Sequence, residues 1–185
     1  RIISANSESV VIIDEAYVDF GAKSVVPLVR KHENLLVVQT FSKSRSLAGI
    51  RVGYAIGQPH LIEAITRIKD SFNSYPIDSF SEAAAVASLS DESYFRECCE
   101  SICNSRSLLT NGLRGLGFDV LPSHANFVFA THPSIVAANV YGELIKRNIL
   151  IRYWNHPRLN NYVRVTVGTE EHSRQFLSEV SQIVG

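Results

Sequence analysis

The chain opens with short apolar runs that polar segments separate, and this pattern predicts the strands of a sheet. Residues 10–13 are all β-branched, and further apolar runs follow at residues 35–39 and 52–56. These runs are too short and too uniform for amphipathic helices, and they are typical of strands buried on both faces in a parallel sheet. In the links between them we expect a short helical crossover at residues 27–31 and a tight turn near Gly49.

A helical period replaces the short runs after Pro59, a residue that suits the first turn of a helix. Apolar residues recur at helical spacing to about residue 72 and predict one helix. Ser79 followed by Glu82 is a capping-box pattern, which predicts a second helix over residues 83–89. We expect a third and much longer helix from about residue 90 to residue 113.

Because such a long helix can leave one domain and enter another, we place a domain boundary near its start. We therefore expect a first domain over residues 1–90 and a second over residues 91–185. In the second, residues 162–167 alternate, with valines on one face and Arg164 and Thr166 on the other. The other elements expected there are strands at 118–121, 126–130 and 149–153 and helices at 133–146 and 170–184. This mixture predicts a small α/β domain with helices on one face of its sheet.

Composition narrows the class of protein. Of the 185 residues, 45% are hydrophobic and 19% are charged, and the formal net charge is zero. This balance is typical of a globular protein and favours neither a nucleic-acid nor a membrane partner. With no visible signal peptide and few cysteines, we expect a cytoplasmic location. The chain begins at Arg1 and contains no Met, so we expect it to be part of a longer protein.

The cysteines and histidines form no metal-binding pattern. Cys98, Cys99 and Cys103 lie close together in a helix-like segment, and an odd number gives no disulfide framework. Cys99 and Cys103 could share a helix face, but no histidine or carboxylate cluster completes a zinc ligand set. We therefore interpret the cysteines as apolar residues and expect no metal.

Chemically useful side chains follow the predicted strands. Asp14 and Tyr17 come after the first, Ser42 and Lys43 after the second, and Arg51 precedes the third. If these strands are neighbours, one crevice holds all five. A lysine at the end of a core strand suits a Schiff base with an aldehyde cofactor, and the set as a whole suits pyridoxal phosphate. Taken alone, Asp14 could equally be a local turn cap and the lysine a surface residue.

Four segments carry a resemblance to a known family. Residues 14–17 (DEAY), 40–43 (TFSK), 48–54 (AGIRVGY) and 160–169 (NNYVRVTVGT) resemble fold-type I pyridoxal-phosphate aminotransferases, and among these the histidinol-phosphate aminotransferase family. The resemblance covers essentially the whole chain. It implies the C-terminal part of a large α/β domain, with a mostly parallel sheet and flanking helices, followed by a small α/β C-terminal domain.

The resemblance also assigns roles in cofactor binding. Lys43 resembles the Schiff-base lysine, which also moves a proton between the substrate and the cofactor. Asp14 resembles the partner of the pyridine nitrogen, and Tyr17 resembles the donor to the ring oxygen. The phosphate ligands implied by the resemblance are two hydroxyl residues and an arginine: Thr40, Ser42 and Arg51. Thr40 could instead make only local hydrogen bonds.

Substrate contacts are implied for the second domain. Arg164 resembles the arginine that binds the carboxylate of the amino-acid substrate. Arg152 is the corresponding candidate for the phosphate end of histidinol phosphate, with a structural salt bridge as the alternative. Asn126 is a candidate for the pocket lining, or else it satisfies backbone groups at a strand start.

The resemblance therefore implies transfer of an amino group between L-histidinol phosphate and 2-oxoglutarate, which yields imidazole acetol phosphate and L-glutamate in histidine biosynthesis. It also implies a homodimer. The alternatives are an aromatic amino-acid aminotransferase, a phospho-amino-acid decarboxylase of the same fold, and an inactive fragment. The last alternative arises because the family's N-terminal half, absent from this sequence, supplies the rest of the cofactor site.

Overall fold

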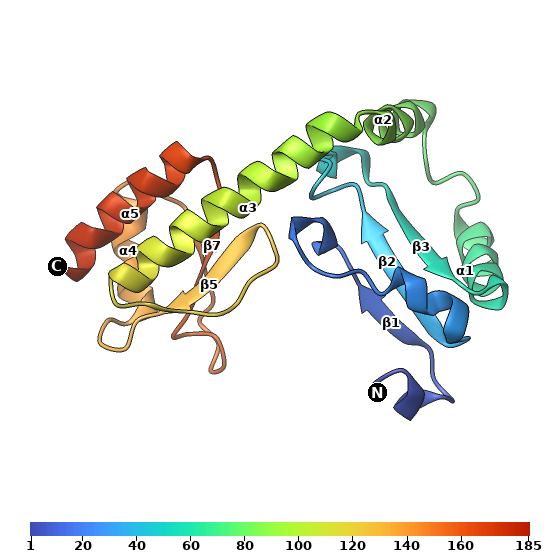
Figure 1. Cartoon of the computed structure of the whole chain (residues 1–185), viewed down its shortest axis with the longest axis horizontal. Coiled ribbons are helices and arrows are strands. Elements are labelled where there is room, and N and C mark those ends of the chain that lie inside the picture. The colour runs from blue at the N-terminus through green and yellow to red at the C-terminus, as the bar shows by residue number, and fades with distance from the viewer. The chain divides into compact units, whose positions relative to one another are not determined.

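The computed structural model describes residues 1–185, which divide into two compact units, Arg1–Arg96 and Glu97–Gly185 (Figure 1). Both units combine a small sheet with helices. The elements of unit 1 are β1 (Val11–Asp14), β2 (Leu35–Thr40), β3 (Gly53–Gly57), α1 (Pro59–Phe72), α2 (Ser79–Ser90) and the first residues of α3 (Glu92–Gly115). Short 3-10 helices occupy Ser4–Asn6, Val18–Phe20, Val26–Lys31 and Ala48–Ile50. None of the helices combines the length and the apolar character that crossing a bilayer requires.

The sheet of unit 1 is mixed, in the order β1-β2-β3. β1 runs parallel to β2, whereas β2 runs antiparallel to β3, with Thr40 opposite Gly53. The prediction of a mostly parallel sheet is therefore wrong for this part of the chain. The physical reason is the link between β2 and β3, which contains only a 3-10 turn, whereas a parallel return needs a crossover that usually includes an α-helix.

Burial in β1 also differs from the prediction. Ile12 is 61% exposed and Val10 is 51% exposed, so the strand is not buried on both faces. Ile13 instead faces the small core that Val29 of the crossover forms with Leu35 and Val37 of β2. Successive side chains point to opposite faces of a strand, and in this chain only one of these faces is covered at β1.

The helices of unit 1 lie where the apolar period places them, with one difference at α2. The helix begins at Ser79, and its N-cap is Asp78 rather than the expected Ser79. The Asp78 carboxylate accepts from the Ser81 amide at 2.9 Å and from the Ser81 hydroxyl at 2.7 Å. An aspartate that reaches the third amide of the helix satisfies an otherwise unpaired donor, which is why it displaces the serine as cap.

Unit 2 contains a four-stranded sheet in the order β4-β5-β7-β6, with every neighbouring pair antiparallel. Its elements are the rest of α3, β4 (Asp119–Val120), β5 (Phe127–Thr131), α4 (Ala137–Lys146), β6 (Arg152–Tyr153), β7 (Val163–Thr166) and α5 (Glu170–Val184). The alternation predicted for residues 162–167 is confirmed, because Val163, Val165 and Val167 are all buried.

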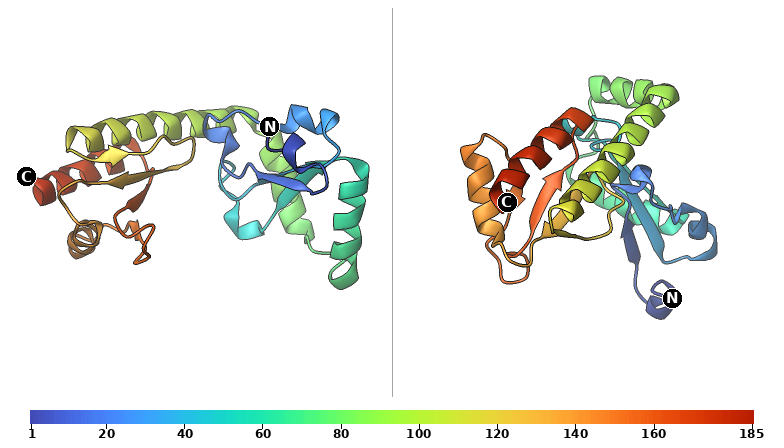
Figure 2. Two further views of the ribbon diagram at one scale, coloured as in Figure 1. Left: turned by 90° about the horizontal axis from the view of Figure 1, so that it is seen from below. Right: turned by 60° about the vertical axis from the view of Figure 1, so that its left-hand side comes forward.

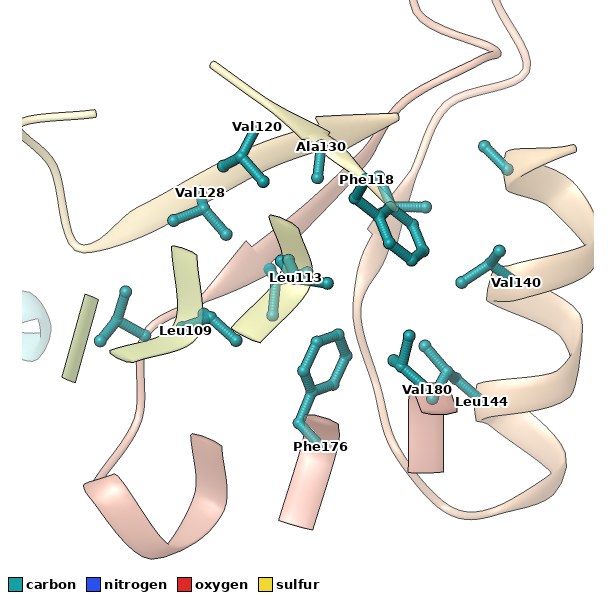
Figure 3. Close-up of a cluster of buried hydrophobic side chains, with 14 residues drawn as sticks. Leu109, Leu113, Phe118, Val120, Val128, Ala130, Val140, Leu144, Phe176 and Val180 are labelled. Atoms are coloured by element: carbon teal, nitrogen blue, oxygen red, sulfur yellow. The ribbon is translucent and has the colours of Figure 1, made fainter. Parts of the chain in front are cut away.

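The core of unit 2 lies between its sheet and its three helices (Figure 3). Its helical side chains are Leu109 and Leu113 from α3, Ala137, Val140 and Leu144 from α4, and Phe176 and Val180 from α5. α5 lies beside α3, where Gly112 leaves room for the side chain of Leu177 (Figure 2). The helices thereby cover one face of the sheet.

Candidate active site

The topology of unit 1 brings the predicted cofactor residues to one edge of the sheet. β1 and β2 are parallel, so Asp14 and Thr40 end their strands at the same edge. β3 begins beside Thr40, which places Arg51, two residues before its start, at that edge as well. The carboxyl ends of parallel strands are where open α/β sheets bind ligands.

Lys43 lies in a turn that directly follows β2. A hydrogen bond of 3.1 Å from the Ser46 amide to the Lys43 carbonyl closes this turn, and Ser46 adopts a left-handed conformation with φ of 57°. The Lys43 Nζ lies 5.4 Å from the centroid of the Tyr17 ring. No carboxylate pairs with this amine, so it is free to bond to a ligand.

Asp14 and Tyr17 occupy the loop that follows β1. One oxygen of Asp14 accepts the Ala16 amide at 2.9 Å, which is the local turn contact considered as an alternative. The carboxylate is exposed and has no cationic partner. Tyr17 precedes the 3-10 helix Val18–Phe20, and the fully buried ring of Phe20 anchors this loop.

The predicted phosphate ligands differ in their local bonding. Thr40 Oγ1 accepts the Ser42 amide at 3.0 Å and lies 3.4 Å from the Val52 carbonyl, so its hydroxyl is engaged locally. The Ser42 hydroxyl makes no hydrogen bond within the chain. Arg51 has a left-handed backbone with φ of 56°, and its exposed guanidinium donates only to the Ala48 carbonyl, at 2.9 Å. A non-glycine residue in that conformation costs free energy, and such residues cluster at functional sites.

The unpaired charges at this edge fit pyridoxal phosphate. Asp14, Lys43 and Arg51 have no oppositely charged side chain as a partner, although other cations of the chain, such as Arg147 and Arg174, form ion pairs. A carboxylate suits a protonated ring nitrogen, an amine suits an aldehyde, and a guanidinium with a free hydroxyl suits a phosphate dianion. The donor set therefore matches the three polar ends of the cofactor.

The two residues that directly follow Lys43, Ser44 and Arg45, hold its turn in place. The sequence alone had assigned a role to neither. The buried hydroxyl of Ser44 donates to Asp19 at 2.5 Å. Arg45 donates to the Ser88 carbonyl at 2.5 Å, and its guanidinium lies 3.9 Å from the centroid of the Phe95 ring. No repeating pattern in the sequence predicts either contact, because each joins segments that are far apart in the sequence.

In unit 2, two arginines meet on the face of the sheet opposite the core. Arg152 of β6 lies directly across from Arg164 of β7. Their guanidinium groups lie 5.2 Å and 5.4 Å from the centroid of the Trp154 ring, and Arg164 also lies 5.1 Å from that of Phe127. Neither arginine pairs with a carboxylate, so the alternative of a salt bridge for Arg152 is not what the structure shows.

The Nε of Arg164 is buried and has no hydrogen-bond partner. A buried donor without a partner is costly, and an anionic ligand would remove that cost. Asn126 precedes β5, and its carbonyl accepts the Val167 amide at 2.8 Å while its side chain makes no hydrogen bond. Trp154 is a contact that sequence analysis missed. As the only tryptophan of the chain, two residues after Arg152, it offered a signal.

No disulfide joins the three cysteines, and no group of three or more metal-binding side chains gathers in the structure.

The chain is similar to proteins of known family. The family described as aminotransferase class I and II matches residues 2–180. A histidinol-phosphate aminotransferase from Acinetobacter baumannii (strain SDF) is 53% identical over 182 residues, which are 98% of this chain and 50% of that protein. The chain spans about half the length of the relatives that it matches.

Solved structures show the same relation. The histidinol-phosphate aminotransferase from Clostridium acetobutylicum superposes with a TM-score of 0.90 at 29% identity, over 99% of this chain and 57% of that one. The enzyme of that name from Sinorhizobium meliloti, in complex with pyridoxal-5'-phosphate, superposes with a TM-score of 0.86 at 25% identity, over 100% of this chain and 52% of that one.

Proposed function

Because the chain belongs to the family of class I and II aminotransferases, we propose that the full-length protein is a pyridoxal-phosphate-dependent aminotransferase of the histidinol-phosphate type. It exchanges an amino group between L-histidinol phosphate and 2-oxoglutarate, giving imidazole acetol phosphate and L-glutamate in histidine biosynthesis. The observation that carries the proposal is the edge of unit 1, where Lys43 lies against Tyr17 with Asp14 and Arg51 left unpaired. The similarity to histidinol-phosphate aminotransferases supports the choice of substrate.

The residues of unit 1 then hold the cofactor. When bound, pyridoxal phosphate supplies a carbonyl that condenses with amines and a ring that withdraws electrons. Lys43 would hold the cofactor through its amine, and the same amine is placed to move the proton at the substrate Cα. Asp14 would accept the hydrogen bond of the ring nitrogen and keep that nitrogen protonated, while Tyr17 would donate to the ring oxygen.

The phosphate of the cofactor is held by Ser42 and Arg51. A guanidinium binds a phosphate dianion through two parallel hydrogen bonds, which fixes orientation as well as position. The hydroxyl of Thr40 already accepts a hydrogen bond from the Ser42 amide, so Thr40 stabilises the turn next to the phosphate.

In unit 2, Arg164 and Arg152 receive the anionic ends of the substrates. L-histidinol phosphate carries a phosphate, and 2-oxoglutarate carries two carboxylates, so both half-reactions present an anion to a guanidinium. Arg164 takes the carboxylate of the amino-acid substrate and Arg152 the phosphate. The side-chain amide of Asn126, which makes no hydrogen bond within the chain, contributes a neutral hydrogen-bonding group to substrate binding.

One observation favours a second candidate function. The Arg164 guanidinium is flanked by two aromatic rings, those of Phe127 and Trp154, which also suits the side chain of an aromatic amino acid. An aromatic amino-acid aminotransferase would use the same cofactor residues and differ only in the substrate group that contacts these rings.

We further propose that unit 1 is the C-terminal part of a large cofactor-binding domain and that unit 2 is the small C-terminal domain. The full-length protein is a cytoplasmic homodimer. Unit 1 exposes large apolar side chains that further protein would cover, including Phe72 (81% exposed), Tyr75 (91%) and Phe80 (78%). Light scattering of the full-length protein measures its oligomeric state.

The decisive experiment uses the full-length protein that contains this chain. Steady-state rates with L-histidinol phosphate and with phenylalanine, each against 2-oxoglutarate, separate the two candidates. We expect a much higher kcat/KM for L-histidinol phosphate. Absence of transfer from it refutes the proposal, and the opposite preference supports the aromatic enzyme. The 185-residue chain alone, tested for a borohydride-trapped cofactor, shows whether half of the site suffices for binding.

A further inference from the structure

Glu15 is a buried carboxylate to which the proposed function gives no role. It follows Asp14 directly and is only 7% exposed. It accepts the Ser24 hydroxyl at 2.8 Å, the Val25 amide at 2.6 Å and the side-chain amide of Gln39 at 2.8 Å. Burying a carboxylate is costly unless it is hydrogen-bonded, and here each oxygen has at least one donor.

The carboxylate determines how Gln39 is oriented. An ionised carboxylate can only accept hydrogen bonds, so Gln39 must present its nitrogen to Glu15. The Gln39 oxygen is then available to the Tyr54 hydroxyl, which donates to it at 2.5 Å. Partial burial raises the pKa of Tyr54, and the charge of Asp19 raises it further, so the phenol keeps the proton that it donates.

This chain of hydrogen bonds ends close to Lys43. Tyr54 of β3 lies opposite Gln39 of β2, and its ring packs edge-on against Phe41 with a centroid distance of 5.7 Å. Phe41 is 6% exposed and precedes Lys43 by two residues. Its amide donates to the Val52 carbonyl at 3.1 Å, so the packing of its ring and the pairing of its backbone support each other.

We propose that Glu15 is a positioning residue that acts through Gln39 and Tyr54 to hold the backbone of residues 40–43, and with it the amine of Lys43. Glu15 touches neither the cofactor nor the substrate in this scheme. The consequence for catalysis rests on the proposed function, whereas the consequence for the backbone does not.

The test is Glu15→Gln in the full-length protein. A glutamine donates as well as accepts, so Gln39 is no longer held in one orientation. We expect the Phe41 and Ser42 amides to exchange with solvent roughly tenfold faster in the cofactor-free protein. With cofactor and substrates, we expect kcat to fall roughly tenfold to a hundredfold while KM stays within about threefold, because the reactive amine is misplaced after binding.

Two further variants sharpen the result. Tyr54→Phe keeps the ring that packs on Phe41 and removes only the hydroxyl. It should therefore change the amide exchange rates and kcat in the same direction as Glu15→Gln does. The double variant should be no worse than the more damaging single one, because both break one chain of hydrogen bonds. Glu33→Gln is the matched control: the same change of charge at an exposed site before β2, with no expected effect.

Three results would each overturn the proposal. The Phe41 and Ser42 amides of Glu15→Gln could exchange as slowly as those of the control, the losses in the double variant could be additive, or kcat of Glu15→Gln could be unchanged. If the unsubstituted protein traps no cofactor at Lys43 with borohydride, the proposed function fails. The exchange rates of the cofactor-free variants then decide alone whether Glu15 holds residues 40–43.

Discussion

Replacing Arg164 by methionine tests the substrate site without disturbing the fold. Methionine retains an unbranched apolar stem, and its sulfur packs well against aromatic rings such as Phe127 and Trp154. The guanidinium has no carboxylate partner to lose, and its Nε is already buried without a hydrogen-bond partner. We therefore expect the Arg164→Met variant to fold with a free energy of unfolding no lower than that of the unsubstituted protein.

The effect on catalysis follows from the bonds that the arginine offers. A guanidinium makes two parallel hydrogen bonds to a carboxylate, and bonds to charged groups contribute about 1.5–3 kcal/mol each. Losing the pair therefore costs about 3–6 kcal/mol, because these contributions are already net of exchange with water. At about 1.4 kcal/mol per tenfold, kcat/KM for L-glutamate should fall roughly 10²- to 10⁴-fold.

The assay is the half-reaction of the full-length protein with L-glutamate, with chemical denaturation as the check on folding. Arg174→Met is the matched control, because Arg174 lies on α5 of the same unit, is 66% exposed and pairs only with Glu170. A loss of less than about tenfold in the Arg164→Met variant, or an equal loss in the control, refutes the assignment of the carboxylate to Arg164.

Three further predictions address the cofactor, the core and a helix cap. Lys43→Ala should abolish both the borohydride-trapped cofactor and amino transfer in the full-length protein, whereas the surface variant Lys69→Ala should retain both; absorbance and peptide mass report the linkage. Leu144→Ala, at a fully buried position of α4, should lower the free energy of unfolding by about 3 kcal/mol, while its exposed neighbour in Ile145→Ala should change it little, as measured by urea denaturation. Hydrogen bonds from Ser81 lower the pKa of Asp78. The stabilisation of α2 by this cap should therefore be fully present above the ordinary aspartate pKa of about 4, and it should be lost as the pH falls through the lower pKa of the folded state. The difference in the free energy of unfolding between the unsubstituted protein and Asp78→Ala should accordingly vanish in acid.

Much of the local structure could be predicted from the order of residues. The helix at Pro59–Phe72 follows the apolar period, and the strand at Val163–Thr166 follows the alternation of valines with polar residues. Both patterns repeat within a few residues, so they report which face of an element is buried. The prediction of Ser79 as a cap was wrong because a better acceptor, Asp78, lies one residue earlier.

The candidate site was predictable in its residue types but not in its geometry. A lysine after a strand, an aspartate after another and an arginine before a third indicated cofactor chemistry. The direction of β3 and the bond between Ser44 and Asp19 were not predictable, since they depend on segments that meet only in the folded chain. The pairing of Arg152 with Arg164 across β6 and β7 belongs to the same class.

By itself, the sequence determined where the strands and helices of this protein lie and which side chains can hold an aldehyde, a phosphate and a carboxylate. Only the tertiary structure decided that β3 runs antiparallel, that Ile12 is exposed, and that Glu15 reaches Tyr54 through Gln39. The physical reason is the range of the interactions. Periodicity and capping act over a few residues, whereas strand pairing and buried hydrogen bonds join residues tens of positions apart, and the whole chain selects among their possible partners.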